Sequence, residues 1–162
     1  MKIEPGTVFA KCCPANIPDE DAAADFYLAA VESLAARGYQ QYEISNFAKS
    51  GCDSRHNLLY WNSHDYLGLG PAAHSCMGKK RFSVPTGTAK FIAQPPQYEQ
   101  QGDVTAEDYI MLQLRLTSGL SLPRLCAQYG IVFSQKQKKF IAQLVQNGMA
   151  RFDDETFALT PK

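Results

Sequence analysis

The chain has 162 residues, of which 45% are hydrophobic and 20% charged, a composition typical of a globular protein with one ordinary domain or two small ones. Sixteen basic residues balance sixteen acidic ones, and this zero formal charge argues against a dedicated nucleic-acid binder or a membrane-surface protein. No apolar run approaches the ~20 residues of a membrane-spanning helix, and residues 1–5 lack the apolar core of a signal peptide, so we expect a cytoplasmic protein.

The cysteines are odd in number and scattered along the chain. Neither a Cys-x-x-Cys pair nor a Cys-x-x-x-Cys-x-x-Cys motif is present. This distribution predicts reduced structural thiols rather than a disulfide framework. The five residues are Cys12, Cys13, Cys52, Cys76 and Cys126.

The first clear elements are a helix and then a strand. Residues 18–21 place a proline and three acids where a helix begins, beside the positive end of its dipole. Arg37 and Gly38 indicate the end of this helix, because a basic residue is common in the last turn and glycine just after it. Residues 39–45 alternate in type and predict a strand. The apolar stripe of the helix is formed by Ala23, Phe26, Tyr27, Ala30, Val31 and Leu34.

Residues 54–61 gather the only Trp, one of the three His and a Tyr within one short stretch. If this stretch is helical, His56 and Tyr60 lie one turn apart, and so do Asn57 and Trp61. All four then share a face of roughly 140°, at about 100° per residue. If the stretch is extended, His56 and Tyr60 still share a side but Trp61 does not.

This cluster has two interpretations. A neutral imidazole ligates haem iron, a phenolate is an alternative ligand, and a flat indole can lie against a macrocycle. In the structural interpretation, His56 and Asn57 cap a local turn while Tyr60 and Trp61 fill a core. Spacing by itself favours the structural interpretation, because aromatic side chains bury large areas.

Residues 65–75 are apolar and rich in small side chains. They predict a strand buried on both faces of a parallel sheet, with backbone exposed to a close ligand. Residues 68–73 also fit the dinucleotide pattern G-x-G-x-x-A. We reject a dinucleotide site, because no long amphipathic helix follows and no acid lies about 20 residues on to hold a ribose. The order of helix, strand, loop and strand indicates an α/β fold.

The composition changes at residues 83–103, which are rich in Pro, Gly and Gln and predict a linker with a short helix near 89–93. Helix starts follow at Thr105, Ser121 and Ser134, and residues 150–159 predict a hairpin. We therefore expect residues 104–162 to form a winged-helix-like domain.

Four motifs occur in order at residues 3–7, 42–48, 55–61 and 66–75. Together they resemble the oxygen-independent coproporphyrinogen III oxidase-like proteins of the radical SAM superfamily, and in particular the HemW haem-chaperone branch. The mark of that branch, His-Asn-x-x-Tyr-Trp, is complete as His56, Asn57, Tyr60 and Trp61. The resemblance also covers residues 114–119.

The resemblance implies an α/β fold with two parts. Residues 1–82 would be the C-terminal remnant of an open (β/α) radical SAM partial barrel, residues 83–103 a linker, and residues 104–162 a HemN-type C-terminal helical domain. Strands at 39–45 and 66–75 would line the face where S-adenosylmethionine and substrate meet. The small residues that would let backbone lie against that cofactor are Gly68, Gly70, Ala72 and Ala73.

The resemblance also implies haem binding and haem transfer. His56 would be the iron ligand and Tyr60 the second candidate. Trp61 would pack on the porphyrin, and Asn57 would orient the imidazole by a hydrogen bond. His74 competes with His56 as a ligand. The implied partners are haem or a porphyrin and a haem-acceptor protein.

The chain departs from the family where it lacks a three-cysteine motif. Three thiolates are needed to anchor the [4Fe–4S] cluster, so we expect the cluster and S-adenosylmethionine chemistry only in a longer parent. The sequence assigns no catalytic residue. We expect a piece truncated at both ends, whose exposed strand edge would favour a homodimer.

Two other functions have distinct signatures. The chain could form the substrate pocket of an oxygen-independent coproporphyrinogen III oxidase. It could also bind nucleic acid, but the neutral composition and the narrow basic face argue against it. That face consists of Gln135, Lys136, Lys138 and Lys139.

Overall fold

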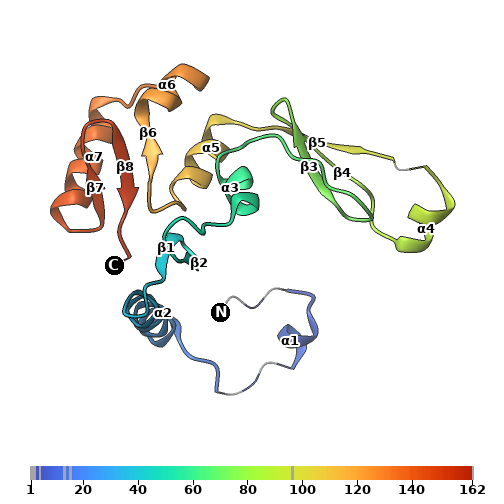
Figure 1. Cartoon of the computed structure of the whole chain (residues 1–162), viewed down its shortest axis with the longest axis horizontal. Helices are drawn as coiled ribbons and strands as arrows, with labels where there is room; N and C mark the ends of the chain where they lie inside the picture. The colour runs from blue at the N-terminus through green and yellow to red at the C-terminus, as the bar shows by residue number, and fades with distance from the viewer. Residues whose placement is uncertain (1–2, 4, 13, 15, 96, 162) are drawn as a thin grey trace.

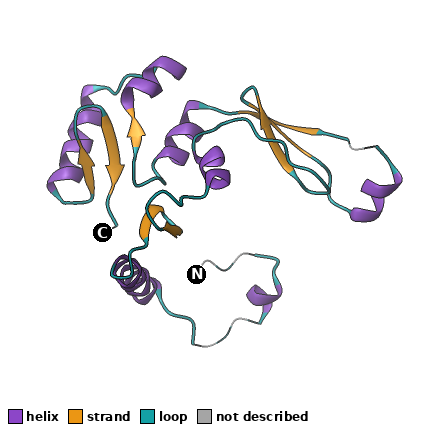
Figure 2. Cartoon of the chain, in the orientation of Figure 1, coloured by secondary structure: helices purple, strands orange, loops and turns teal. Residues whose placement is uncertain are grey.

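A computed structural model describes residues 3, 5–12, 14, 16–95 and 97–161. Figure 1 shows the helices and strands of the C-terminal part at one end and a long β arm at the other. Helix α3 (Arg55–Trp61) and helix α5 (Ala106–Gln113) lie between these two ends. Figure 2 shows that loops connect small separate sheets, so the described chain is a mixed α/β structure.

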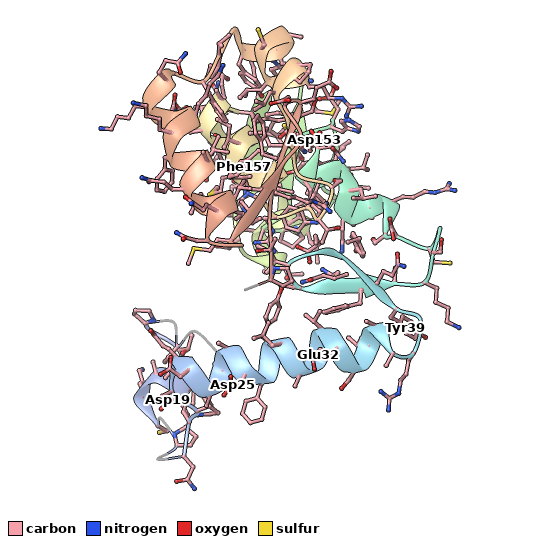
Figure 3. All side chains as sticks on the ribbon, turned by 90° about the vertical axis from the view of Figure 1, so that its left-hand side faces the viewer. Asp19, Asp25, Glu32, Tyr39, Asp153 and Phe157 are labelled. Atoms are coloured by element: carbon pink, nitrogen blue, oxygen red, sulfur yellow. The ribbon has the colours of Figure 1, made fainter. Side chains whose placement is uncertain are left out.

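Two helices precede the first sheet. Helix α1 (Val8–Lys11) is short, and helix α2 (Glu20–Ala35) confirms the predicted helix. The side chain of Asp19 accepts a hydrogen bond from the amide of Ala22, which caps α2. No residue of α2 is buried, and Phe26 of the predicted apolar stripe is 67% exposed. Figure 3 shows α2 running below the C-terminal elements, from Asp19 past Asp25 and Glu32.

The predicted strand at 39–45 is confirmed as β1 (Gln40–Glu43), but its partner was not predicted. Strand β2 (Asn46–Ala48) pairs antiparallel with β1, with Gln41 opposite Phe47. The chain reverses after Glu43 because its carboxylate accepts hydrogen bonds from the amide of Ser45 and the side chain of Asn46. The strand ladders of the described chain are antiparallel, so the expected parallel pairing is wrong for these residues.

The strand predicted over residues 65–75 is also wrong for most of its length. Strand β3 (His74–Met77) pairs antiparallel with β4 (Lys80–Ser83), and Tyr66 forms an isolated bridge with Cys76. Between Tyr66 and the start of β3 the chain is a loop, because Gly70 and Ala72 adopt φ angles of 105° and 61°. Such angles are incompatible with a strand.

The predicted linker contains two elements. Helix α4 (Thr88–Ala93) confirms the short helix near 89–93, and β5 (Glu99–Asp103) pairs with β4. All residues of β5 are exposed, so no apolar pattern in the sequence signals this strand. The boundaries at 82, 103 and 104 stay predictions, although β5 attaches part of the expected linker to the β arm.

The C-terminal elements agree with the three predicted helices and the hairpin. After α5 come β6 (Leu120–Ser121), α6 (Leu122–Tyr129) and α7 (Gln135–Gln146). Strands β7 (Ala150–Phe152) and β8 (Thr156–Leu159) form the hairpin, and the sheet order is β6-β8-β7. The buried core residues of this part are Tyr109, Leu120, Leu125, Ile141, Ala150 and Phe157.

Candidate functional site

Helix α3 carries the four residues that the sequence marks as a haem site, and it confirms the helical alternative. The helix begins after Ser54, whose hydroxyl accepts a hydrogen bond from the amide of Asn57 at 3.3 Å. It ends at Trp61, with Asn62 as its C-terminal cap. In Figure 1, α3 lies beside α5, near the middle of the molecule. The four side chains nevertheless have different surroundings.

His56 and Tyr60 form a pair on the open side of α3. The Tyr60 hydroxyl and His56 Nε2 are 2.8 Å apart, and the ring centroids are 4.9 Å apart in an edge-to-face arrangement. Tyr60 also makes an edge-to-face contact with Tyr66, at 4.5 Å between centroids. Burial raises the pKa of Tyr66, and the neighbouring Cys76 thiol and Tyr60 add to this. The imidazole of His56 is exposed, so an incoming ligand can reach it.

Asn57 contacts the first sheet instead of the imidazole. Its side-chain amide donates to the Tyr42 hydroxyl at 3.2 Å. The expected hydrogen bond from Asn57 to His56 is therefore replaced by two others, because the imidazole of His56 is bonded to Tyr60. The reason is geometric, since adjacent helix positions point about 100° apart and Asn57 lies over β1.

Trp61, the last residue of α3, contacts the end of α5 and the residues that follow it. The Arg115 guanidinium lies 4.3 Å from the centroid of the indole ring, a cation–π contact. The Trp61 carbonyl accepts a hydrogen bond of 2.8 Å from the side-chain amide of Gln113. One face of the indole is thus covered by a side chain of the C-terminal part, which restricts the ring surface that a macrocycle could contact.

Glu43 anchors this arrangement, and sequence reasoning missed it. Its carboxylate is fully buried and accepts a hydrogen bond of 2.9 Å from Arg115, besides those from Ser45 and Asn46. Burial raises the pKa of this carboxyl, but the hydrogen bonds and the Arg115 charge outweigh it, and the net pKa lies below its usual value. No sequence pattern could pair Glu43 with Arg115, because they lie far apart in the chain and on different elements.

The four small residues expected to contact a cofactor lie in the loop before β3: Gly68, Gly70, Ala72 and Ala73. A Cβ atom at Gly68 would lie 2.3 Å from the His74 carbonyl oxygen, so the loop's own packing already requires glycine there. The amide of Ala73 donates to the carbonyl of Gly70 at 3.2 Å. Contact between this loop and S-adenosylmethionine stays a prediction. His74 itself is exposed on β3.

Two hollows are lined partly by residues of the C-terminal sheet, and Arg115 lines the first of them. A groove of about 410 Å³ runs between α2, β1 and the end of β8, and Tyr27, Leu28 and Leu116 are among its lining residues. A second hollow of about 310 Å³ is lined mainly by apolar side chains of α7 and β8. Leu114 and Leu159 line both. No histidine lines either hollow, so neither offers an imidazole to iron.

The described residues do not fit an iron–sulfur cluster. Among them no three His, Cys, Asp or Glu side chains are grouped closely enough to hold a metal ion. Their cysteines are free, at Cys12, Cys52, Cys76 and Cys126, while Cys13 lies outside the described residues. A haem iron needs a single axial donor from the protein, which the exposed His56 can supply.

In the described part of the chain no helix is both long enough and apolar enough to cross a membrane.

The sequence is similar to one known domain family and to several characterised proteins. Residues 101–162 match the HemN C-terminal domain. The heme chaperone HemW of Bacillus subtilis (strain 168) is 33% identical over 170 residues, covering 98% of this chain and 45% of that protein. The heme chaperone HemW of Escherichia coli (strain K12) is 38% identical over 112 residues, covering 67% of this chain and 29% of that protein. The chain therefore spans less than half the length of these relatives.

A solved structure has a similar fold. Coproporphyrinogen III oxidase (HemN) from Escherichia coli, a radical SAM enzyme, superposes with a TM-score of 0.64. The similarity covers 91% of this chain and 39% of that chain, at 20% sequence identity. This similarity is one of fold, and it extends beyond residues 101–162 that match the C-terminal domain.

Proposed function

We propose that this chain, which corresponds to the C-terminal part of HemW- and HemN-like proteins, binds haem through the imidazole–phenol pair on α3. The observation that supports this proposal most directly is the exposed imidazole of His56, which lies beside the Tyr60 hydroxyl on α3. An exposed imidazole supplies an axial ligand to haem iron without requiring a preformed metal cluster. His56 or Tyr60 would ligate the iron of the bound haem.

The pair also determines what the protein must do before it can ligate iron. If the Tyr60 hydroxyl donates to Nε2, the lone pair needed by a metal is already used. His56 can then act as a ligand only after this hydrogen bond is broken, which requires the imidazole or the half-buried Tyr60 to turn away. The alternative ligand is the Tyr60 oxygen itself, which the same pairing places at the same surface.

The first experiment is a titration of the chain with ferric haem. Wild-type protein should give a Soret shift, and His56→Ala should weaken binding by at least about tenfold because it removes the axial ligand. His64→Ala is the matched control, since His64 is also an exposed histidine, and His74→Ala tests the competing ligand. An unchanged spectrum and affinity in His56→Ala would reject the site, and loss of the Soret shift in His74→Ala would transfer ligation to His74.

Tyr60→Phe separates the two possible ligands. If His56 ligates the iron, removing the competing hydrogen bond should leave the Soret shift in place and tighten binding. The gain should be about two- to tenfold, which corresponds to about 0.5–1.5 kcal/mol for a neutral hydrogen bond. Weaker binding with loss of a phenolate charge-transfer band would instead make Tyr60 the ligand.

The finer features of the longer protein are part of the same proposal. Residues 1–82 would complete the open barrel, and residues 104–162 would form the winged-helix-like domain. S-adenosylmethionine and a [4Fe–4S] cluster would be bound only in a longer parent protein, with the loop at 68–73 near the cofactor. A haem-acceptor protein and a homodimer belong to the proposal as well. Size-exclusion chromatography with and without haem measures the oligomeric state.

A further inference from the structure

We infer that Gln113 and Arg115 are positioning residues for the proposed haem site, holding α3 in place from the C-terminal part of the chain. This inference rests on the proposed function, because it concerns the helix that carries His56. Neither side chain contacts His56 or Tyr60 among the interactions that the structure describes. Both act at the C-terminal end of α3, through Trp61 and Asn62.

Helix α3 depends on such contacts because it is short and poorly buried. It comprises residues Arg55–Trp61, and none of them is buried. Isolated helices shorter than about 12 residues are marginal in water, so tertiary contacts must define where this one lies. Its N-terminal end is capped locally by Ser54. Its C-terminal end is the part that reaches α5.

Gln113 binds that C-terminal end. Its side chain is 3% exposed, and its Nε2 donates to the Trp61 carbonyl at 2.8 Å and to Asn62 Oδ1 at 3.2 Å. The last carbonyls of a helix lack partners within the helix, so the buried amide satisfies one of them. Asn62 in turn donates to the Leu58 carbonyl at 2.8 Å. Both protons of one amide are thus used at the end of α3.

Arg115 holds the indole of Trp61 from the same segment. Its guanidinium lies 4.3 Å from the ring centroid while its Nη2 donates to the buried carboxylate of Glu43. Arg115 is fixed in turn by its backbone, since its carbonyl accepts from the Ile44 amide at 3.1 Å. Trp61 therefore lies against a cation that is itself anchored to β1.

The Gln113 contacts at the end of α3 should affect both Trp61 and His56. Loss of the Gln113 contacts should let the end of α3 shift, which changes the environment of Trp61 and the presentation of His56 one turn away. Trp61 is the only tryptophan in the sequence, so its fluorescence reports on this contact without labelling. Ferric haem absorption reports on the other side of the same helix.

The experiment compares Gln113→Glu and Gln113→Met with Gln143→Glu, a matched control on the exposed side of α7. Glutamate has the shape of glutamine but turns acceptors toward the Trp61 carbonyl and Asn62 Oδ1, so it should be the more disruptive variant. We expect ferric haem affinity to fall about fivefold or more for Gln113→Glu and less for Gln113→Met, on the scale of a lost buried hydrogen bond. The Soret shift at a given haem concentration should weaken in parallel, and Trp61 emission should shift in both variants.

Gln113→Met keeps the side-chain volume without burying a charge, so it separates the amide's hydrogen bonds from simple space filling. Wild-type haem affinity and Trp61 emission in this variant would overturn the inference. Circular dichroism checks that each variant is folded. If Gln113→Glu does not fold, Arg115→Lys is the second test, because it keeps the charge near Glu43 and removes the planar group over the indole. Unchanged Trp61 emission and haem binding in that variant would also count against the inference.

The two proposals fail in different ways. If His56→Ala binds haem as the wild type does, the proposed function is wrong whatever the Gln113 variants do. If His56→Ala loses the Soret shift while both Gln113 variants keep it with full affinity, the haem site stands and the positioning role is wrong.

Discussion

Replacing Glu43 with glutamine tests whether one buried carboxylate joins β1 to the segment that follows α5. The carboxylate is fully buried, accepts from Ser45 and Asn46, and forms an ion pair of 2.9 Å with Arg115. Glutamine keeps the volume and one acceptor oxygen, but it removes the charge beside the guanidinium. The test therefore isolates the electrostatic part of the contact.

The magnitude follows from the partners. A hydrogen bond to a charged group contributes about 1.5–3 kcal/mol, and leaving a guanidinium without its partner adds to the loss. The Arg115 side chain is 31% exposed, so water replaces part of the lost interaction. We expect Glu43→Gln to lower the free energy of unfolding by about 1.5–3 kcal/mol at neutral pH, by this estimate.

The pH dependence supplies a second criterion. The folded-state pKa of Glu43 lies below its usual value, so its stabilisation is present above the unfolded-state pKa and is lost as pH falls through the folded-state pKa. The difference in unfolding free energy between wild type and Glu43→Gln should therefore shrink on acidification.

Urea unfolding followed by circular dichroism and by Trp61 fluorescence measures this difference at several pH values. Glu32→Gln on the exposed face of α2 is the control, expected within about 0.5 kcal/mol of wild type. The reasoning is refuted if Glu43→Gln resembles Glu32→Gln at neutral pH, or if its effect is independent of pH. A double-mutant cycle with Arg115→Met then apportions the coupling between the two side chains.

Three further substitutions test packing. Leu125→Ala should lower the free energy of unfolding by about 2–5 kcal/mol, because the side chain is 1% exposed in the C-terminal core. A urea titration that gives a loss below half of the smaller value would contradict that packing. Gly119→Ala should destabilise by about 1–3 kcal/mol in the same assay, since a Cβ there would lie 2.6 Å from the Phe157 carbonyl oxygen at a φ angle of 80°; a neutral effect would count against this close approach. Gly68→Ala should destabilise the protein by a similar amount, because the new Cβ would lie 2.3 Å from the His74 carbonyl oxygen. A melting temperature equal to that of the wild type would show instead that the loop at 68–73 can adjust.

Local signals account for the elements that the sequence predicts correctly. Helix α2 begins at a capping Asp19, α7 begins at a capping Ser134, and the strand β1 lies inside the predicted alternation. The pairing of His56 with Tyr60 is likewise a consequence of helical spacing. Each of these depends on residues within one or two turns of each other, and their side chains and backbone suffice to define them.

Predictions that required knowledge of distant partners are the ones that the structure changes. The apolar run at 65–75 gives no indication that Gly70 and Ala72 adopt positive φ angles, and the polar composition of β5 hides its pairing with β4. Asn57 was expected to face the imidazole, but Tyr42 was the acceptor available across the fold.

The sequence by itself therefore determined the short-range features: helix starts, the β7–β8 hairpin and the imidazole–phenol pair on one helical face. The tertiary structure decided which side of α3 stays open, because Gln113 and Arg115 arrive from a segment about fifty residues further along and take up the Trp61 side. Hydrogen bonds and ion pairs between distant segments form only when the backbone has brought their atoms within about 3 Å, and no local pattern encodes that proximity.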